Sequence, residues 1–70
     1  MTHLEKQGFV FQYLCNVDPD FLCRRLCISR QLFLDWIRGR KPIDEASLSY
    51  ALSLFGQTRD TFDFLCSRVN

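Results

Sequence analysis

Hydrophobic residues recur along this chain at the three- and four-residue spacing of helices, not in the alternation typical of strands. The first such stripe is formed by Val10, Tyr13, Leu14 and Val17, at positions i, i+3, i+4 and i+7. Phe9 and Phe11 flank this stripe, so we expect the first helix to be either broadly buried or partly exposed at its start. Gly8 predicts that the first seven residues form a looser lead-in.

Four further helices are predicted from their start and stop signals. The strongest start is Asp18-Pro19-Asp20, because aspartate caps free N–H groups, proline suits the first helical position, and a second carboxylate complements the helix dipole. Ser29 is a natural N-cap, and Gly39 is a natural helix end. We therefore predict helices over residues 19–27, 30–38 and 44–55, and from residue 58 or 59 onward.

Each of these helices carries its hydrophobic residues on one face. The predicted inward positions are Leu22, Cys23, Leu26, Phe33, Trp36, Leu48, Ala51, Leu52, Phe55, Phe62, Leu65, Cys66 and Val69. Phe64 falls off the inward face of the last helix, and an exposed phenylalanine invites a partner. The pattern predicts an all-α fold, a compact bundle of five short helices that forms a single domain over residues 1–70.

Composition supports a small globular domain in a reducing compartment. Hydrophobic residues make up 47% of the 70 positions and charged residues 24%, so a compact core can form. No apolar run approaches the ~18 residues of a membrane span, and no apolar leader follows Met1. The four cysteines contain no CxxC pair, so we expect buried thiols, with a metal site or a disulfide as alternatives. The cytoplasm fits these features best.

Charge is distributed unevenly although the net charge is only +1. Residues 24–41 have a net charge of +5, whereas the segments before and after them each have −2. The basic residues of this middle segment are Arg24, Arg25, Arg30, Arg38, Arg40 and Lys41. Such a distribution suits a patch that binds a polyanion, and it suits an ordinary solvated face equally well.

Residues 19–39 satisfy the packing requirements of a helix-turn-helix. Two short helices joined by a short turn need apolar residues where they face each other, a small residue where they cross and an apolar residue in the turn. Leu22 and Leu26 meet the first requirement, Cys23 the second and Ile28 the third. Phe33 and Trp36 supply the inner face of the second helix.

The same stretch resembles a known family. LCRRLCISRQLFLDWIRGRKP, followed by LSYALSLFG, is similar to the pattern LAxxLGISxxxISxWxxGxxxP and then LxxLAxxLG of the phage Cro/C1 repressor family, also called the XRE family. This resemblance implies a lambda-repressor-like fold and a transcriptional regulator, of phage, prophage or plasmid origin, that binds specific duplex DNA sequences. It also implies a homodimer on a pseudo-palindromic site, with no cofactor.

The resemblance assigns roles to individual residues. Arg30 and Gln31 stand at the first base-reading positions, and both side-chain types can pair with base edges. Leu32 and Asp35 fall at further groove-facing positions. The residues implied to contact phosphates are Arg25, Arg38, Arg40 and Lys41, with Arg24 as the other candidate on its helix. The candidates for the dimer surface are Phe55, Phe64, Leu65 and Val69.

The sequence also departs from the family pattern. Cys27 occupies a turn position that is usually glycine, which implies strain or a slightly different turn. Asp18 and Asp20 stand where the family's helix abuts a phosphate, and carboxylates repel phosphates. Asp35 is an uncommon base reader for the same reason.

Leucine and isoleucine on the outer side of the second helix raise an alternative function. Leu32, Leu34 and Ile37 could anchor another protein, with Arg30, Asp35 and Arg38 as a polar rim. Small phage regulators of this fold that bind a repressor instead of DNA are the precedent within the family. Catalysis is not expected, because His3 is the only histidine and no nucleophile has an identifiable base partner.

Overall fold

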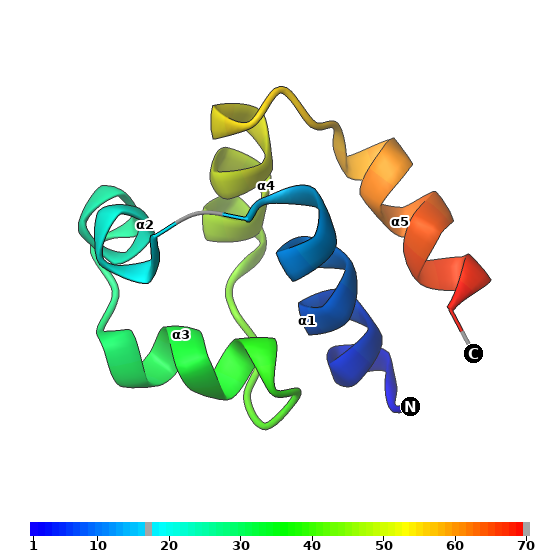
Figure 1. Ribbon diagram of the computed structural model, residues 1–70, viewed down its shortest axis with the longest axis horizontal. Helices are drawn as coiled ribbons and strands as arrows, with labels where there is room; N and C mark the ends of the chain where they lie inside the picture. Colours follow the sequence, from blue (N-terminus) through cyan, green and yellow to red (C-terminus); the bar gives the residue numbers. More distant parts are fainter. Residues whose placement is uncertain (17, 70) are drawn as a thin grey trace.

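The computed structural model describes residues 1–16 and 18–69, and in this part of the chain all regular structure is helical (Figure 1). The five helices are α1 (His3–Leu14), α2 (Pro19–Leu26), α3 (Arg30–Ile37), α4 (Glu45–Leu54) and α5 (Arg59–Arg68). Helix α1 runs through the middle of the molecule and packs against α3 on one side and α5 on the other. Helix α2 packs against α3 and α4. The prediction of an all-α bundle of five short helices is confirmed.

The start of α1 differs from the prediction. The helix begins at His3, so the expectation of a loose lead-in over the first seven residues is wrong. A capping box explains the early start: the Glu5 N–H donates to Thr2 Oγ1 at 3.1 Å, and the Thr2 N–H donates to Glu5 Oε1 at 2.7 Å. These two bonds satisfy N–H groups that a helix start otherwise leaves without partners.

The buried face of α1 is also rotated from the predicted stripe. Gln7, Val10, Phe11 and Cys15 are buried, whereas Tyr13 is 77% exposed. The prediction that Tyr13 faces inward is therefore wrong. Val17, the last member of the predicted stripe, lies outside the described residues.

The other helix boundaries follow local signals, as predicted. The N-caps Asp18, Ser29, Asp44 and Thr58 each accept a hydrogen bond from a backbone N–H of the first turn. Left-handed backbone follows three of the helices, at Cys27, Gly39 and Gly56. The observed ends lie within about two residues of the predicted ones.

The core centres on Trp36, which is fully buried. The ring of Phe11 meets it edge-on at 4.8 Å between centroids, and the ring of Phe33 lies 6.4 Å from it. Most of the predicted inward residues are buried, but Phe55, Leu65 and Val69 are only partly buried at the margin of the core. Among the residues described, no helix combines the length and the apolarity that crossing a membrane requires.

Candidate nucleic-acid interface

The candidate interface is built on α2, the turn at residues 27–29, and α3. In Figure 1, α2 is seen along its axis while α3 lies across the view, so the two helices cross steeply. The Ile28 N–H donates to the Cys23 carbonyl at 3.2 Å, which fixes the start of the turn. Leu22 and Cys23 are buried, and Ile28 packs against the core. Two short helices thus pack against each other across a short turn, which is the packing that the sequence predicts for this stretch.

The turn contains the positive φ that the sequence pattern implies. Cys27 has φ 56° and ψ 41°, which is the left-handed region. A side chain there is strained, because its Cβ crowds the neighbouring carbonyl. The turn nevertheless forms, since the Cys27 N–H donates to the Cys23 carbonyl and closes α2.

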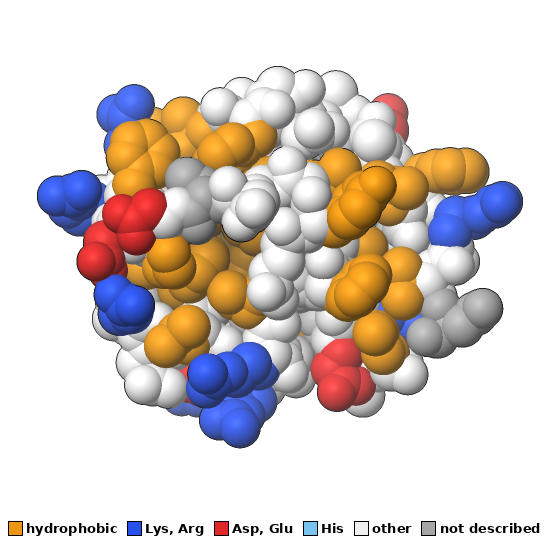
Figure 2. Space-filling view, in the orientation of Figure 1, with side chains coloured by type: hydrophobic (Ala, Val, Ile, Leu, Met, Phe, Trp, Pro, Cys, Tyr) orange, Lys and Arg blue, Asp and Glu red, His pale blue; other side chains and the backbone are white. Residues whose placement is uncertain are grey.

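Six cationic side chains surround this unit and form what we call the basic surface. They are Arg24, Arg25, Arg30, Arg38, Arg40 and Lys41, and all six are exposed. Figure 2 shows the blue side chains along the left and lower edges of the molecule, over α2, α3 and the loop after α3. The charge cluster seen in the sequence is therefore also a cluster in space.

The two predicted base-reading residues lie on this surface, and both make contacts within the chain. The Arg30 guanidinium forms an ion pair with Asp20 across the helix crossing, and both side chains are about 60% exposed. Gln31 is exposed, and its Nε2 donates to Asp35 Oδ1 at 3.0 Å. Arg30 must release Asp20, and Gln31 must release Asp35, before either side chain can bind a ligand.

Asp35 does not lie on the outward face. The residue is only 8% exposed, so the prediction that it faces a DNA groove is wrong. Its carbonyl accepts from the Arg40 N–H at 2.8 Å, and its carboxylate lies 3.9 Å from Lys41 Nζ. The loop after α3 therefore folds back on Asp35, whose charge offsets part of the positive charge of Lys41.

The three hydrophobic residues of the alternative hypothesis are less exposed than the sequence suggests. Leu32, Leu34 and Ile37 are all half-buried. Ile37 packs against the core, so its predicted outward position is wrong.

The carboxylates at the start of α2 lie beside the basic surface. Asp18 Oδ1 accepts from the Asp20 N–H at 3.2 Å, so Asp18 caps the helix as predicted. Both residues are exposed, and Asp20 holds Arg30. Negative charge thus lies at one edge of an otherwise cationic area.

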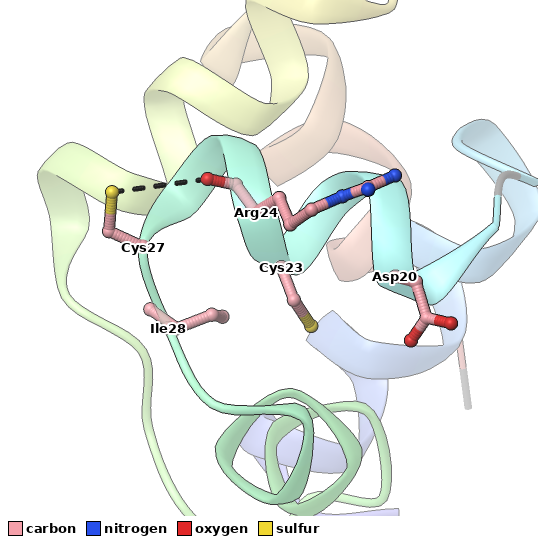
Figure 3. A pocket seen from close by; sticks show the side chains of 5 residues that line it. All are labelled: Asp20, Cys23, Arg24, Cys27 and Ile28. Carbon is pink, nitrogen blue, oxygen red and sulfur yellow. Dashed lines mark hydrogen bonds between the residues drawn. The ribbon is translucent and has the colours of Figure 1, made fainter.

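A shallow depression of about 550 Å³ lies beside α2 and the turn, lined by Asp20, Cys23, Arg24, Cys27 and Ile28 (Figure 3). The thiols of Cys23 and Cys27 point in different directions, and Cys27 Sγ turns toward the Arg24 carbonyl at 3.9 Å.

All four cysteines are free thiols. Nowhere in residues 1–16 and 18–69 do three histidine, cysteine, aspartate or glutamate side chains gather closely enough to hold a metal ion.

The four predicted dimer residues do not all lie on one surface. Leu65 and Val69 line an apolar groove of about 310 Å³ between α1 and α5, together with Phe9, Val10, Tyr13 and Arg68. Phe64 is 60% exposed on α5, as its position off the inward face predicts. Phe55 packs against the core at the end of α4 and does not line this groove. The sequence stripe left out Phe9 and placed Tyr13 inward, because it put α1 in a different rotation.

Comparisons with protein-family models, with curated proteins and with solved structures yield no match. The case for a function therefore rests on the residues of the chain itself.

Proposed function

We propose that this protein binds duplex DNA through the basic surface, with α3 entering the major groove, and that it acts as a transcriptional regulator of the Cro/repressor type. The observation that carries the proposal is the joint exposure of all six cations of the basic surface around α2, α3 and the loop after α3. Cationic side chains arranged around one helix are the electrostatic pattern of a duplex-binding protein. The proposal implies a cytoplasmic protein.

Within this proposal, the residues divide by task. Arg30 and Gln31 stand on the first turn of α3, where they would contact base edges and give sequence preference. Arg38, Arg40 and Lys41 follow the helix and would contact phosphates. Arg25 on α2, whose guanidinium stacks 5.5 Å from the Phe21 ring, would contact the backbone on the other side. A single domain reads few base pairs, so a homodimer on a pseudo-palindrome is the expected bound form.

Protein binding through the outer side of α3 remains the second candidate function. Two observations support DNA more strongly: Ile37 packs against the core, and the exposed large hydrophobic residues lie on other parts of the molecule. Leu32 and Leu34, which are both half-buried, would have to supply such an interface.

The test is a titration of fluorescently labelled genomic DNA fragments with the folded protein, repeated over a range of salt concentrations. Lys41→Ala should weaken binding to all fragments and flatten the slope of log affinity against log salt by about 0.9, because one phosphate contact is lost. Arg30→Ala and Gln31→Ala should instead reduce the preference among fragments, by about 1–3 kcal/mol for each good bidentate contact.

Lys6→Ala is the matched control, since Lys6 lies in the cleft lined by Arg59 and Asp63, away from α3. It removes the same charge and should leave the DNA titration unchanged. Absence of binding at low salt by protein that is folded would overturn the proposal. A pull-down in which Leu34→Asp abolishes capture of a partner would then favour the protein-binding function.

A further inference from the structure

Asp35 and Gln31 are four residues apart on α3, so they lie on the same face of the helix. Gln31 is exposed, whereas Asp35 is buried. The hydrogen bond from Gln31 Nε2 to Asp35 Oδ1, at 3.0 Å, is the only side-chain contact between the two residues that α3 makes along this face. It joins a candidate base-reading residue on the surface to a carboxylate that the chain covers.

The Asp35 carboxylate determines which end of the Gln31 amide faces it. A carboxylate only accepts hydrogen bonds, whereas a primary amide has two N–H donors at one end and an acceptor oxygen at the other. If the amide turned over, Gln31 Oε1 would face Asp35 Oδ1, and two acceptors repel each other. The observed orientation commits one N–H of Gln31 to Asp35 and leaves one N–H and the carbonyl oxygen for a ligand.

We propose that Asp35 is a positioning residue that makes Gln31 recognise adenine and reject guanine in the major groove. The inference rests on the proposed DNA-binding function and names the base that this function recognises. Adenine presents an acceptor, N7, beside a donor, the N6 amino group. The N–H and the carbonyl oxygen that Gln31 retains match this pair.

Guanine is rejected because it presents two acceptors, N7 and O6. A Gln31 side chain that has donated one N–H to Asp35 has one N–H left, so one guanine acceptor would be buried without a partner. If Asp35 were absent, both N–H groups of Gln31 could donate to guanine. Asp35 therefore sets the preference between the two purines without contacting DNA itself.

The loop after α3 holds Asp35 from its other side. The Arg40 N–H donates to the Asp35 carbonyl at 2.8 Å, and Lys41 Nζ lies 3.9 Å from Asp35 Oδ2. One residue thus contacts both the candidate base reader and the loop whose cations are proposed to contact phosphates. Asp35 thereby fixes the position of Gln31 relative to the phosphate contacts, which a side chain needs in order to meet one base edge repeatedly.

The test is the selection of bound sequences from a pool of randomised duplex DNA by the folded wild-type protein and its variants. The wild type should prefer adenine to guanine at one position of its site, and Gln31→Ala should abolish the preference there. Asp35→Ala should lower the ratio of adenine to guanine at that position about tenfold, the effect of one base contact. Asp60→Ala removes the same charge from an exposed position of α5 and is the matched control, so its ratio should equal that of the wild type.

Two further variants distinguish positioning from a merely structural role. In the Gln31→Ala background, Asp35→Ala should not change the ratio any further, because Asp35 acts only through Gln31. A distortion of α3 would change base preferences in both backgrounds. Asp35→Asn keeps the shape of the side chain but can present either an oxygen or an N–H to Gln31, so the ratio should fall between those of the wild type and Asp35→Ala.

Nuclear magnetic resonance of the protein without DNA gives a spectroscopic readout of the same contact. The Gln31 side-chain N–H that is donated to Asp35 should exchange with water more slowly in the wild type than in Asp35→Ala. Equal exchange in the two proteins would show that Asp35 does not hold the amide and would overturn the inference.

Failure of this inference is distinguishable from failure of the proposed function. Folded wild-type protein that binds no DNA at low salt would overturn both. Wild-type protein that selects DNA sequences, but whose adenine preference is the same in Asp35→Ala and Asp35→Asn, would overturn the inference alone. A preference that does not depend on Gln31, or a Gln31-dependent preference for guanine, would do the same.

Discussion

Gly8 in the middle of α1 lies against the carbonyl group of Ile37 at the end of α3. A Cβ atom built on Gly8 would stand only 2.1 Å from the Ile37 carbonyl oxygen, far inside van der Waals contact. A Cβ on Gly39 would likewise stand 2.4 Å from Cγ of Glu5. Two glycines thus let the start of α1 approach the end of α3 at backbone distance, and this contact fixes where α3 lies on the molecule.

The first prediction is that Gly8→Ala destabilises the protein. Alanine is the better helix former by ~1 kcal/mol, but here its methyl group would push α1 away from α3. Overpacking of this kind lowers the free energy of unfolding by about 1–3 kcal/mol. Urea denaturation followed by circular dichroism measures the change. Ser49→Ala, at an exposed position of α4, is the control and should change stability by less than about 0.5 kcal/mol. A Gly8→Ala protein as stable as the wild type would contradict the close contact.

Gly8 is an example of a feature that could not be predicted from the sequence, in contrast to the helix starts. The helix starts at Asp18, Ser29 and Asp44 depend on bonds within three residues, so local pattern located them. A glycine inside a helix has no such local signal, because the glycine is required by the close approach of the backbone of another helix. The face of α1 could not be fixed for a similar reason: stripes containing Tyr13 or Phe11 both have helical spacing, and only packing against Trp36 selects Phe11.

The candidate site likewise has some features that the sequence predicts and others that it does not. The cations of the basic surface were predictable, since residues 24–41 are adjacent in the sequence and most lie on short helices or in a short loop. The burial of Asp35 was not, because it arises when the loop after α3 folds back and Arg40 donates to the Asp35 carbonyl. The α1–α5 groove joins residues some fifty positions apart, and a single sequence gives no sign of that contact.

The second prediction is that Cys27→Gly stabilises the protein. Glycine adopts the left-handed backbone of this position without the ~1–2 kcal/mol cost of a side chain, although its unfolded state is more flexible. The net gain should be about 0.5–1 kcal/mol, or a few degrees in Tm for a domain of this size. Thermal denaturation measures it. Cys27→Ala keeps the Cβ atom and should bring no gain, and equal stabilisation by both substitutions would show that backbone strain is not the cause.

The third prediction concerns the thiols. Burial raises the pKa of Cys15 to about 11, and burial also raises the pKa values of Cys23 and Cys66. The thiolate is the reactive form, so these three should react slowly, whereas Cys27 is exposed. Alkylation of the folded protein at about pH 8, followed by mass spectrometry, should therefore label Cys27 first and the other three only after denaturation. Rapid labelling of Cys23 in the folded protein would contradict its burial beside the turn.

The fourth prediction is a loss of stability in acid that depends on the α4 cap. Hydrogen bonds from the Ser47 hydroxyl, at 2.7 Å, and from the Ser47 N–H, at 3.0 Å, hold the pKa of Asp44 below its ordinary value of 3.8. The pKa of Asp44 is lower in the folded state than in the unfolded state, so its carboxylate stabilises the fold fully at any pH above the ordinary pKa value. This stabilisation is lost as the pH falls through the folded-state pKa. The Thr2 N–H and hydroxyl lower the pKa of Glu5 and act in the same direction.

Asp44→Ser separates this effect from general acid unfolding, because serine still caps a helix but does not titrate. The stability of this variant, measured by urea denaturation between about pH 6 and pH 3, should fall less steeply than that of the wild type. Parallel curves for the two proteins would show that the capping carboxylate does not contribute to acid sensitivity.

The fifth prediction tests the ion pair between Asp20 and Arg30. Within the proposed DNA-binding function, Asp20 competes with DNA for the Arg30 guanidinium and also repels phosphates. Asp20→Asn should therefore raise DNA affinity by about fivefold at low salt, on the order of the ~1 kcal/mol that a unit charge exerts at ~4 Å in water. The gain should shrink as salt is added, since the effect is electrostatic.

Glu45→Gln is the matched control for this substitution. Glu45 contacts Arg59 at the start of α4, and its exposed ion pair contributes little to stability. It removes the same negative charge away from the basic surface, so DNA affinity should remain close to the wild-type value. Equal gains from the two substitutions would show that only net charge matters, whereas a gain confined to Asp20→Asn would show that release of Arg30 is what strengthens binding. If Asp20→Asn weakens binding instead, the ion pair positions Arg30 for its ligand, and the acidic start of α2 is part of the interface.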